Sequence, residues 1–326
     1  MVSPGGYMKW FAVAALAVCA FAAPSQAETC NKPLKILSRI PLTTENDTQR
    51  LLVPADIDGK PVNLLLDTGA FASMLNLRTA TALDLKLMDA PVKGYDVAGR
   101  YTDQMTEAQF KLGMVQFNKV QFMVSERLDR LNENGVIGAN LLAKFDVSID
   151  PAGRQLDLLS PDHCADAVVY WPADVVAKIP FGHDPDHKII IDVVLDGKPL
   201  KAALDTGAEN STLFLKTAER QFGLTPGAAD TPKTDKVNGE VDAYHHTFKF
   251  LTLGGVAVAN PTVTLIPDQM SEHFMATSAG SRIAHTDEGM QWDMLLGMNV
   301  LRHLHLYIAY KDNMLYLTPA EPAKTK

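Results

Sequence analysis

The residues best suited to chemistry in this sequence are two aspartates, each in a short stretch that occurs twice. Asp67 lies in Leu-Leu-Leu-Asp-Thr-Gly-Ala over residues 64–70, and Asp205 lies in Ala-Ala-Leu-Asp-Thr-Gly-Ala over residues 202–208. Both stretches follow Asp-Gly-Lys-Pro. A single Asp-Thr-Gly arises readily by chance, because Asp and Gly are common turn residues. Two copies with the same run-up indicate a paired site instead.

The position of each aspartate predicts what the pair could do. Each one follows an apolar run and precedes Thr-Gly, which predicts a carboxylate where a buried strand ends in a tight turn. If the two turns face each other, Asp67 and Asp205 become neighbours in a sparsely hydrated site. Two such carboxylates do not both ionise easily, so they share a proton and provide one acid and one base. This chemistry needs no metal and no cofactor.

The elements that must position the aspartates also occur twice in the same order. Each copy has a strand-like segment that runs into Asp-Gly, the dipeptide favoured in tight hairpin turns. The next strand, 62–66 or 200–204, delivers the aspartate, and a short helix is predicted at 77–85 or 215–222. Each copy then ends in an apolar strand leading to glycine, a short helix and a closing hairpin.

The middle of each copy predicts a further hairpin. Gly99 and Gly239 each lie between two polar, alternating arms, and on pattern alone both read as ordinary surface hairpins. The second copy is the longer one. Its extra residues fall in the polar segment 269–291, which we interpret as an insertion loop.

Length and charge restrict the class of protein. The chain has 326 residues, 47% of them hydrophobic, which suits one large or two medium globular domains. Its formal net charge of −8 argues against nucleic acid as the main partner.

The N-terminus predicts export. Residues 1–27 combine Lys9, an apolar segment and small residues before position 28, the layout of a secretory signal peptide. A membrane anchor is the weaker alternative because the apolar segment is short for a bilayer span. We therefore expect a periplasmic or secreted protein without stable membrane insertion after cleavage. Cleavage would leave Cys30 and Cys164, for which an oxidising compartment favours a disulfide over two free thiols.

Together these motifs resemble those of the retropepsin-like and pepsin-like aspartic proteases, over about residues 40–318. Two tetrapeptides look like the catalytic turns of that clan: Asp67-Thr68-Gly69-Ala70 and Asp205-Thr206-Gly207-Ala208. Two apolar-glycine pairs look like those that follow the strand behind each turn: Ile137-Gly138 and Leu296-Gly297.

The resemblance implies a mostly β, two-lobed acid-protease fold. Each lobe would be a small β-barrel-like unit with a flap hairpin and a short helix, over residues 28–165 and 166–326. By similarity, Thr68 and Thr206 would lock the two turns together through hydroxyl-to-backbone bonds. The hairpins around Gly99 and Gly239 would cover the substrate as flaps. One chain already supplies both halves of a site, which implies a monomer.

The resemblance also implies an aspartic endopeptidase acting on an extended polypeptide bound between the lobes. Ala70 and Ala208 stand where pepsins often have Ser or Thr, as in retropepsins. Loss of hydroxyls that bond the carboxylates predicts a higher titration range, with optimal activity nearer about pH 4.5–6.5 than about pH 2.

Two other interpretations compete with this one. The first is a catalytically inactive, secreted peptide-binding module of the same fold, although a decayed enzyme would usually have lost an Asp or Thr of the motif. The second is a metal hydrolase built on His245-His246 or on His303 and His305. No matching set of further ligands accompanies these histidines at ligand spacing, so no metal site is predicted.

Overall fold

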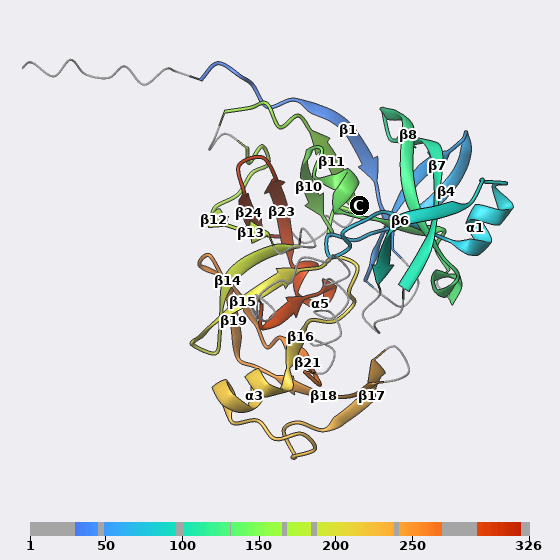
Figure 1. Cartoon of the computed structure of the whole chain (residues 1–326). Coiled ribbons are helices and arrows are strands. Elements are labelled where there is room, and N and C mark those ends of the chain that lie inside the picture. Colours follow the sequence, from blue (N-terminus) through green and yellow to red (C-terminus); the bar gives the residue numbers. More distant parts are fainter. Residues whose placement is uncertain are drawn as a thin grey trace, which may run out of the picture. The chain divides into compact units, whose positions relative to one another are not determined.

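The computed structural model of this chain describes residues 30–44, 49–95, 101–130, 132–164, 168–183, 188–237, 241–268 and 292–320 (Figure 1). All described helices and strands lie within residues 32–326, which form one compact unit. The predicted signal peptide, the flap candidates Gly99 and Gly239, and the predicted insertion 269–291 lie outside the described residues.

The described residues are mostly β, as the sequence predicts. In the first half the strands are β1 (Ile36–Pro41), β2 (Thr43–Thr44), β3 (Leu51–Ile57), β4 (Lys60–Leu66), β5 (Met74–Asn76), β6 (Met88–Tyr95), β7 (Tyr101–Leu112), β8 (Val115–Ser125), β9 (Gly135–Ile137), β10 (Asp146–Asp150) and β11 (Gln155–Leu159). The helices of this half are α1 (Leu77–Ala82), η1 (Glu126–Arg130) and α2 (Ala139–Leu142).

The second half has the same kinds of element. Its strands are β12 (Ala177–Pro180), β13 (Gly182–His183), β14 (Ile189–Leu195), β15 (Lys198–Leu204), β16 (Thr212–Phe214), β17 (Lys233–Val237), β18 (Val241–Thr247), β19 (Phe250–Leu253), β20 (Val256–Ala259), β21 (Thr262–Ile266), β22 (Met294–Leu296), β23 (Leu304–Ala309) and β24 (Met314–Pro319). Its helices are α3 (Leu215–Phe222) and α5 (Met298–Leu301).

Each half contains a sheet built on the same pairings. The first has the strand order β2-β3-β4-β9-β5-β8-β7-β6, and the further pairing of β3 with β7 curls it towards a barrel. The second has the order β17-β18-β21-β16-β22-β15-β14-β19-β20. In both, the strand that delivers the aspartate pairs antiparallel with the strand before it and parallel with a later one, β9 or β22.

A third sheet joins the two halves. It has six strands in the order β1-β11-β10-β23-β24-β12, three from each half. The halves meet where β10 pairs antiparallel with β23, with Val147 opposite Ile308 and Ile149 opposite Leu306 (Figure 1). These four side chains are fully buried, so both halves share one hydrophobic core. The predicted lobe boundary at 165/166 falls in the connection between β11 and β12.

The local signals in the sequence explain the strands that lead to each aspartate. The predicted Asp-Gly turns are confirmed, since both residues of each turn have positive φ, at 48° and 77° for Asp58-Gly59 and 43° and 79° for Asp196-Gly197. β4 and β15 have the same burial pattern, with the last three residues of each strand buried. Neighbouring strands on both sides pair the backbone of these residues, which are at most 3% exposed.

The sequence predicted the C-terminal end of one helix correctly and that of the other too late in the chain. The helix at 215–222 is confirmed as α3, and Gly223 ends it with φ at 69°, which glycine adopts at little cost. The helix predicted at 77–85 was too long, because α1 ends at Ala82. Asp84 has φ at 58°, a left-handed conformation that no helix can continue through. Among the described residues, no helix is long and apolar enough to cross a membrane.

Cys30 and Cys164 are both disulfide-bonded in the structure. The amide of Cys164 donates to the carbonyl of Lys32 at 3.2 Å. Nearby, Lys32 Nζ lies 2.5 Å from Asp162 Oδ1.

We expect residues 28–326, the part of the chain that follows the predicted signal peptide, to show no free thiol when unfolded without reductant. After reduction, two thiols should react with a thiol reagent. Two reactive thiols before reduction would contradict the disulfide.

Candidate active site

The two aspartates lie at matching positions, directly after the last residues of β4 and β15. The amide of Asp67 donates to the carbonyl of Ile137 at 3.1 Å, and the amide of Asp205 donates to the carbonyl of Leu296 at 3.0 Å. The apolar-glycine pairs singled out in the sequence therefore hold the start of each aspartate turn. They do so from the parallel strand next to it, β9 or β22.

Each turn folds back on its own carboxylate. In both turns, the two amides that follow the threonine donate to Oδ1 of the aspartate. The distances are 2.9 Å from Gly69 and 2.9 Å from Ala70 to Asp67, and 2.9 Å from Gly207 and 3.0 Å from Ala208 to Asp205. These bonds fix one oxygen of each carboxyl group and favour its charged form.

The glycine of each turn packs against the carboxyl group of the other turn. A Cβ atom on Gly69 would lie 2.5 Å from Cγ of Asp205, and one on Gly207 would lie 2.3 Å from Cγ of Asp67. No real side chain tolerates such contacts, so these positions must be glycine for the turns to approach. The crossed packing brings the two carboxyl groups together, and a side-chain hydrogen bond joins them.

The two threonines lock the turns to each other. The amide of Thr68 donates to Oγ1 of Thr206, and the amide of Thr206 donates to Oγ1 of Thr68, both at 3.1 Å. Each hydroxyl then donates across the interface to a strand carbonyl, from Thr68 to Leu204 at 3.0 Å and from Thr206 to Leu66 at 2.7 Å. Thr68 is 1% exposed and Thr206 is fully buried, so water cannot replace these four bonds.

A serine-asparagine pair in each half supports the turn, and the sequence analysis did not assign it. The amide and hydroxyl of Ser73 both donate to Oδ1 of Asn140, at 2.7 and 2.8 Å, and the Ser73 hydroxyl accepts from the amide of Gly138 at 3.0 Å. Ser211 and Asn299 repeat this arrangement, with both bonds at 2.8 Å. The signal was present, because each serine lies six residues after its aspartate and each asparagine two after its glycine.

The electrostatics of the pair are unequal although its backbone geometry is matched. Burial, then the charge of Asp205 and the hydrogen bond with it, hold the pKa of Asp67 well above its usual range. Burial also raises the pKa of Asp205, but four interactions oppose this: the charge of Lys188, the hydrogen bond with Asp67, and the amides of its own turn. Two buried carboxyl groups with raised pKa values do not both ionise easily, so the pair favours one proton shared between them.

The remaining sequence-predicted features lie elsewhere or outside the described residues. The arms of the predicted flap hairpins are strands that pair antiparallel, with Tyr95 opposite Tyr101 in β6 and β7 and Val237 opposite Val241 in β17 and β18. The tips of both hairpins, which contain Gly99 and Gly239, lie outside the described residues.

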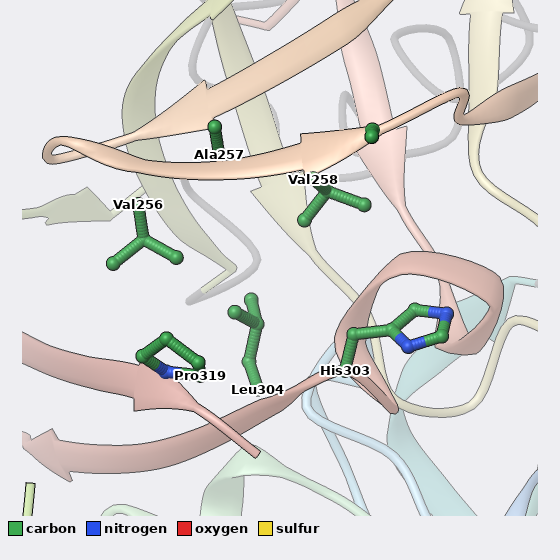
Figure 2. A pocket seen from close by; sticks show the side chains of 7 residues that line it. Val256, Ala257, Val258, His303, Leu304 and Pro319 are labelled. Carbon is green, nitrogen blue, oxygen red and sulfur yellow. The ribbon is translucent and has the colours of Figure 1, made fainter. Parts of the chain in front are cut away.

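The pocket in Figure 2 does not belong to this site. It has a volume of about 250 Å³ and is mostly apolar, with the lining Val256, Ala257, Val258, Ala259, His303, Leu304 and Pro319. It contains neither aspartate. Of the second pair of histidines considered as metal ligands, His303 lines this pocket, whereas Nε2 of His305 lies 2.9 Å from Oγ of Ser148 on the six-stranded sheet. Within the ranges that the structure describes, no group of three His, Cys, Asp or Glu side chains could hold a metal ion.

Comparison with known proteins assigns the family and the fold. A sequence model of the family described as "Aspartyl protease" matches residues 53–141 and 191–300, together more than half of the chain. Among solved structures, the chain is similar to Basic 7S globulin from soybean, with a TM-score of 0.53 and 9% identity, over 90% of this chain and 98% of the other.

A second similar structure is the aspartic proteinase from Irpex lacteus. Its TM-score is 0.52 at 13% identity, over 88% of this chain and 98% of the other. One of these structures is named a globulin and the other a proteinase, so the shared fold does not by itself identify an activity. No curated protein matches the sequence.

We expect Thr68→Val to destabilise the protein by about 2–4 kcal/mol, because it leaves a buried amide and a buried carbonyl of the other turn without partners. Valine has nearly the shape of threonine, so the loss reflects hydrogen bonds rather than volume. Thr68→Ser keeps the hydroxyl and is the matched control. Urea unfolding of both variants measures the difference, and equal stability of the valine and serine variants would contradict the role of these bonds.

Proposed function

The chain belongs to the aspartyl protease family, and we propose that it is an endopeptidase that hydrolyses peptide bonds through a water activated between Asp67 and Asp205. The observation that carries this proposal is the joined pair of buried carboxyl groups, held by two locked turns and both raised in pKa. A pair with one proton between them offers an acid and a base at the same place.

The charge of Lys188, which lowers the pKa of Asp205, suggests how the roles divide. Ionised Asp205 takes a proton from the water, whose oxygen attacks the carbonyl carbon of the peptide. Protonated Asp67 donates to the carbonyl oxygen as negative charge develops there. Protons then pass to the leaving nitrogen as the C–N bond breaks, and the carboxyl groups return to their starting states. No covalent bond to the protein forms in this sequence of steps.

The sheet edges support an extended polypeptide as the substrate. Among the strands that the structure describes, β6 and β17 each end the strand order of their sheet, so no described strand of that sheet pairs with their outer main-chain groups. Both strands belong to the hairpins predicted to be flaps. An extended peptide can add to such edges through main-chain hydrogen bonds. Binding of this kind depends on the backbone of the peptide more than on the identity of its side chains. Export through residues 1–27 and action as a monomer are parts of the same proposal.

We expect Asp67→Asn and Asp205→Asn each to lower the rate of cleavage of an unstructured protein by about 10²–10⁴-fold, because each removes either the acid or the base. Purified residues 28–326 would be assayed from about pH 3 to about pH 8, with an optimum expected at about pH 4.5–6.5. Asp192→Asn is the matched control, since Asp192 is 83% exposed on β14 and pairs with Lys201 on the neighbouring strand β15.

Cleavage that the two active-site variants lack and the Asp192 variant retains would support the enzyme. An Asp67 or Asp205 variant with near wild-type rates would contradict the assignment. Absence of cleavage at every pH, from protein shown to be folded, would favour the inactive peptide-binding module instead.

A further inference from the structure

A buried lysine lies beside the carboxyl pair, at a position that no motif of the sequence pointed out. Lys188 directly precedes β14 and is only 6% exposed. β14 pairs antiparallel with β15, where Ile190 lies opposite Ala203. Continuing that register by two residues sets Lys188 opposite Asp205. A lysine is rarely buried unless its charge has a role or a partner.

The first half has a basic residue at the corresponding position. Arg50 directly precedes β3, and Leu52 lies opposite Leu65 of β4, so the same continuation sets Arg50 opposite Asp67. In each copy the basic residue comes 17 residues before the aspartate. The position is therefore a shared feature of the two halves.

The surroundings of the two basic residues differ. Nη2 of Arg50 lies 3.5 Å from Oε1 of Glu133, a side chain that is only 1% exposed. Glu133 comes five residues before Gly138, and the residue five before Gly297 is Trp292. The position that holds a carboxylate in the first half therefore holds an indole ring in the second.

Trp292 makes this part of the second half apolar. It is 6% exposed and packs against Phe214, with ring centroids 5.3 Å apart. Ile190 belongs to the same apolar cluster and lies on the same side of its strand as Lys188, because alternate residues share a face. Charges interact more strongly in such surroundings than in water.

The charge of Lys188 acts on Asp205. After burial, it is the largest influence on the pKa of that carboxyl group, which it lowers. Among the described residues, the other groups that act on Asp205 are the carboxyl group of Asp67 and the amides of Gly207 and Ala208. For Asp67, the charge of Asp205 is the largest electrostatic influence, and it raises the pKa of Asp67.

We propose that Lys188 is a positioning residue that decides which aspartate of the pair is ionised. Its ammonium group, on the Asp205 side, keeps Asp205 as the carboxylate base and leaves the shared proton on Asp67. In a pair with symmetric surroundings either aspartate could hold that proton. The halves differ at this place, because Nη2 of Arg50 lies 3.5 Å from Oε1 of Glu133 in the first half and Trp292 takes the position of Glu133 in the second. The catalytic consequence rests on the proposed function, whereas the electrostatic one does not.

The test compares Lys188→Met with Lys188→Arg, which keeps the charge. Lys201→Met is the matched control, since Lys201 lies on the adjoining strand β15 with its side chain 58% exposed and pairs with Asp192 at 3.0 Å. Loss of the buried charge makes Asp205 harder to ionise, so the acidic limb of the kcat/KM profile should move to higher pH. On that limb we expect the methionine variant of Lys188 to lose about tenfold in kcat/KM, with the plateau little changed. The arginine variant and the control should follow the wild type.

A second readout needs no catalysis. The carboxyl ¹³C resonances of Asp67 and Asp205, assigned with the two Asp→Asn variants, report the titration of each group directly. In Lys188→Met the Asp205 resonance should titrate at higher pH than in the wild type. If the methionine variant does not fold, Lys188→Gln replaces it, with urea unfolding as the check.

The outcomes separate the two proposals. An unchanged Asp205 titration in a folded Lys188→Met or Lys188→Gln variant would overturn the role of Lys188, even if the enzyme cleaves peptides. A shifted titration in a chain that cleaves nothing would support Lys188 and contradict the proposed function. A shift of the same size in the Lys201 control would show a general charge effect and would also overturn the proposal.

Discussion

The site depends on the crossed hydrogen bonds between Thr68 and Thr206. Each threonine accepts from the amide of the other and donates to a carbonyl of the opposite half. The four bonds are buried, so breaking them would leave polar groups without water or protein partners. They hold the two turns so close together that the carboxyl groups do not both ionise easily and share a proton. The position of each aspartate follows from this contact.

The rest of the fold supplies rigid support for that contact. Each turn begins at the end of a strand buried between two neighbours, and the serine-asparagine pairs fix where the chain goes next. The six-stranded sheet joins the two halves through a separate set of backbone bonds. The halves are therefore held at two places, the turns and this sheet, which restricts their movement relative to each other. Such support is what a site needs if two acidic groups are to stay in contact.

Matching backbones in this protein carry different charges. The turns, their amides, the threonines and the serine-asparagine pairs correspond residue by residue in the two halves. The basic residues also correspond, but Arg50 lies beside Glu133, whereas the corresponding position in the second half is Trp292. A pair of aspartates needs close contact to share a proton, and unequal surroundings to place it. Duplicated geometry can meet the first need, and only a difference between the copies can meet the second.

The sequence by itself determined the parts of this protein that depend on neighbours along the chain. The Asp-Gly hairpins, the buried strands before each aspartate, the helix ended by Gly223 and the mostly β fold could all be predicted, because turn conformation and burial follow local residue types. The helix at 77–82 was predicted too long, since nothing local distinguished the left-handed Asp84 from a helical residue.

Only the tertiary structure decided which residues from distant parts of the chain meet. It brought Ser73 to Asn140, set each turn glycine against the opposite carboxyl group, and buried Lys188 on the Asp205 side. These contacts join residues that lie far apart in the sequence. They depend on strand register and on how sheets pack, which composition and spacing do not encode.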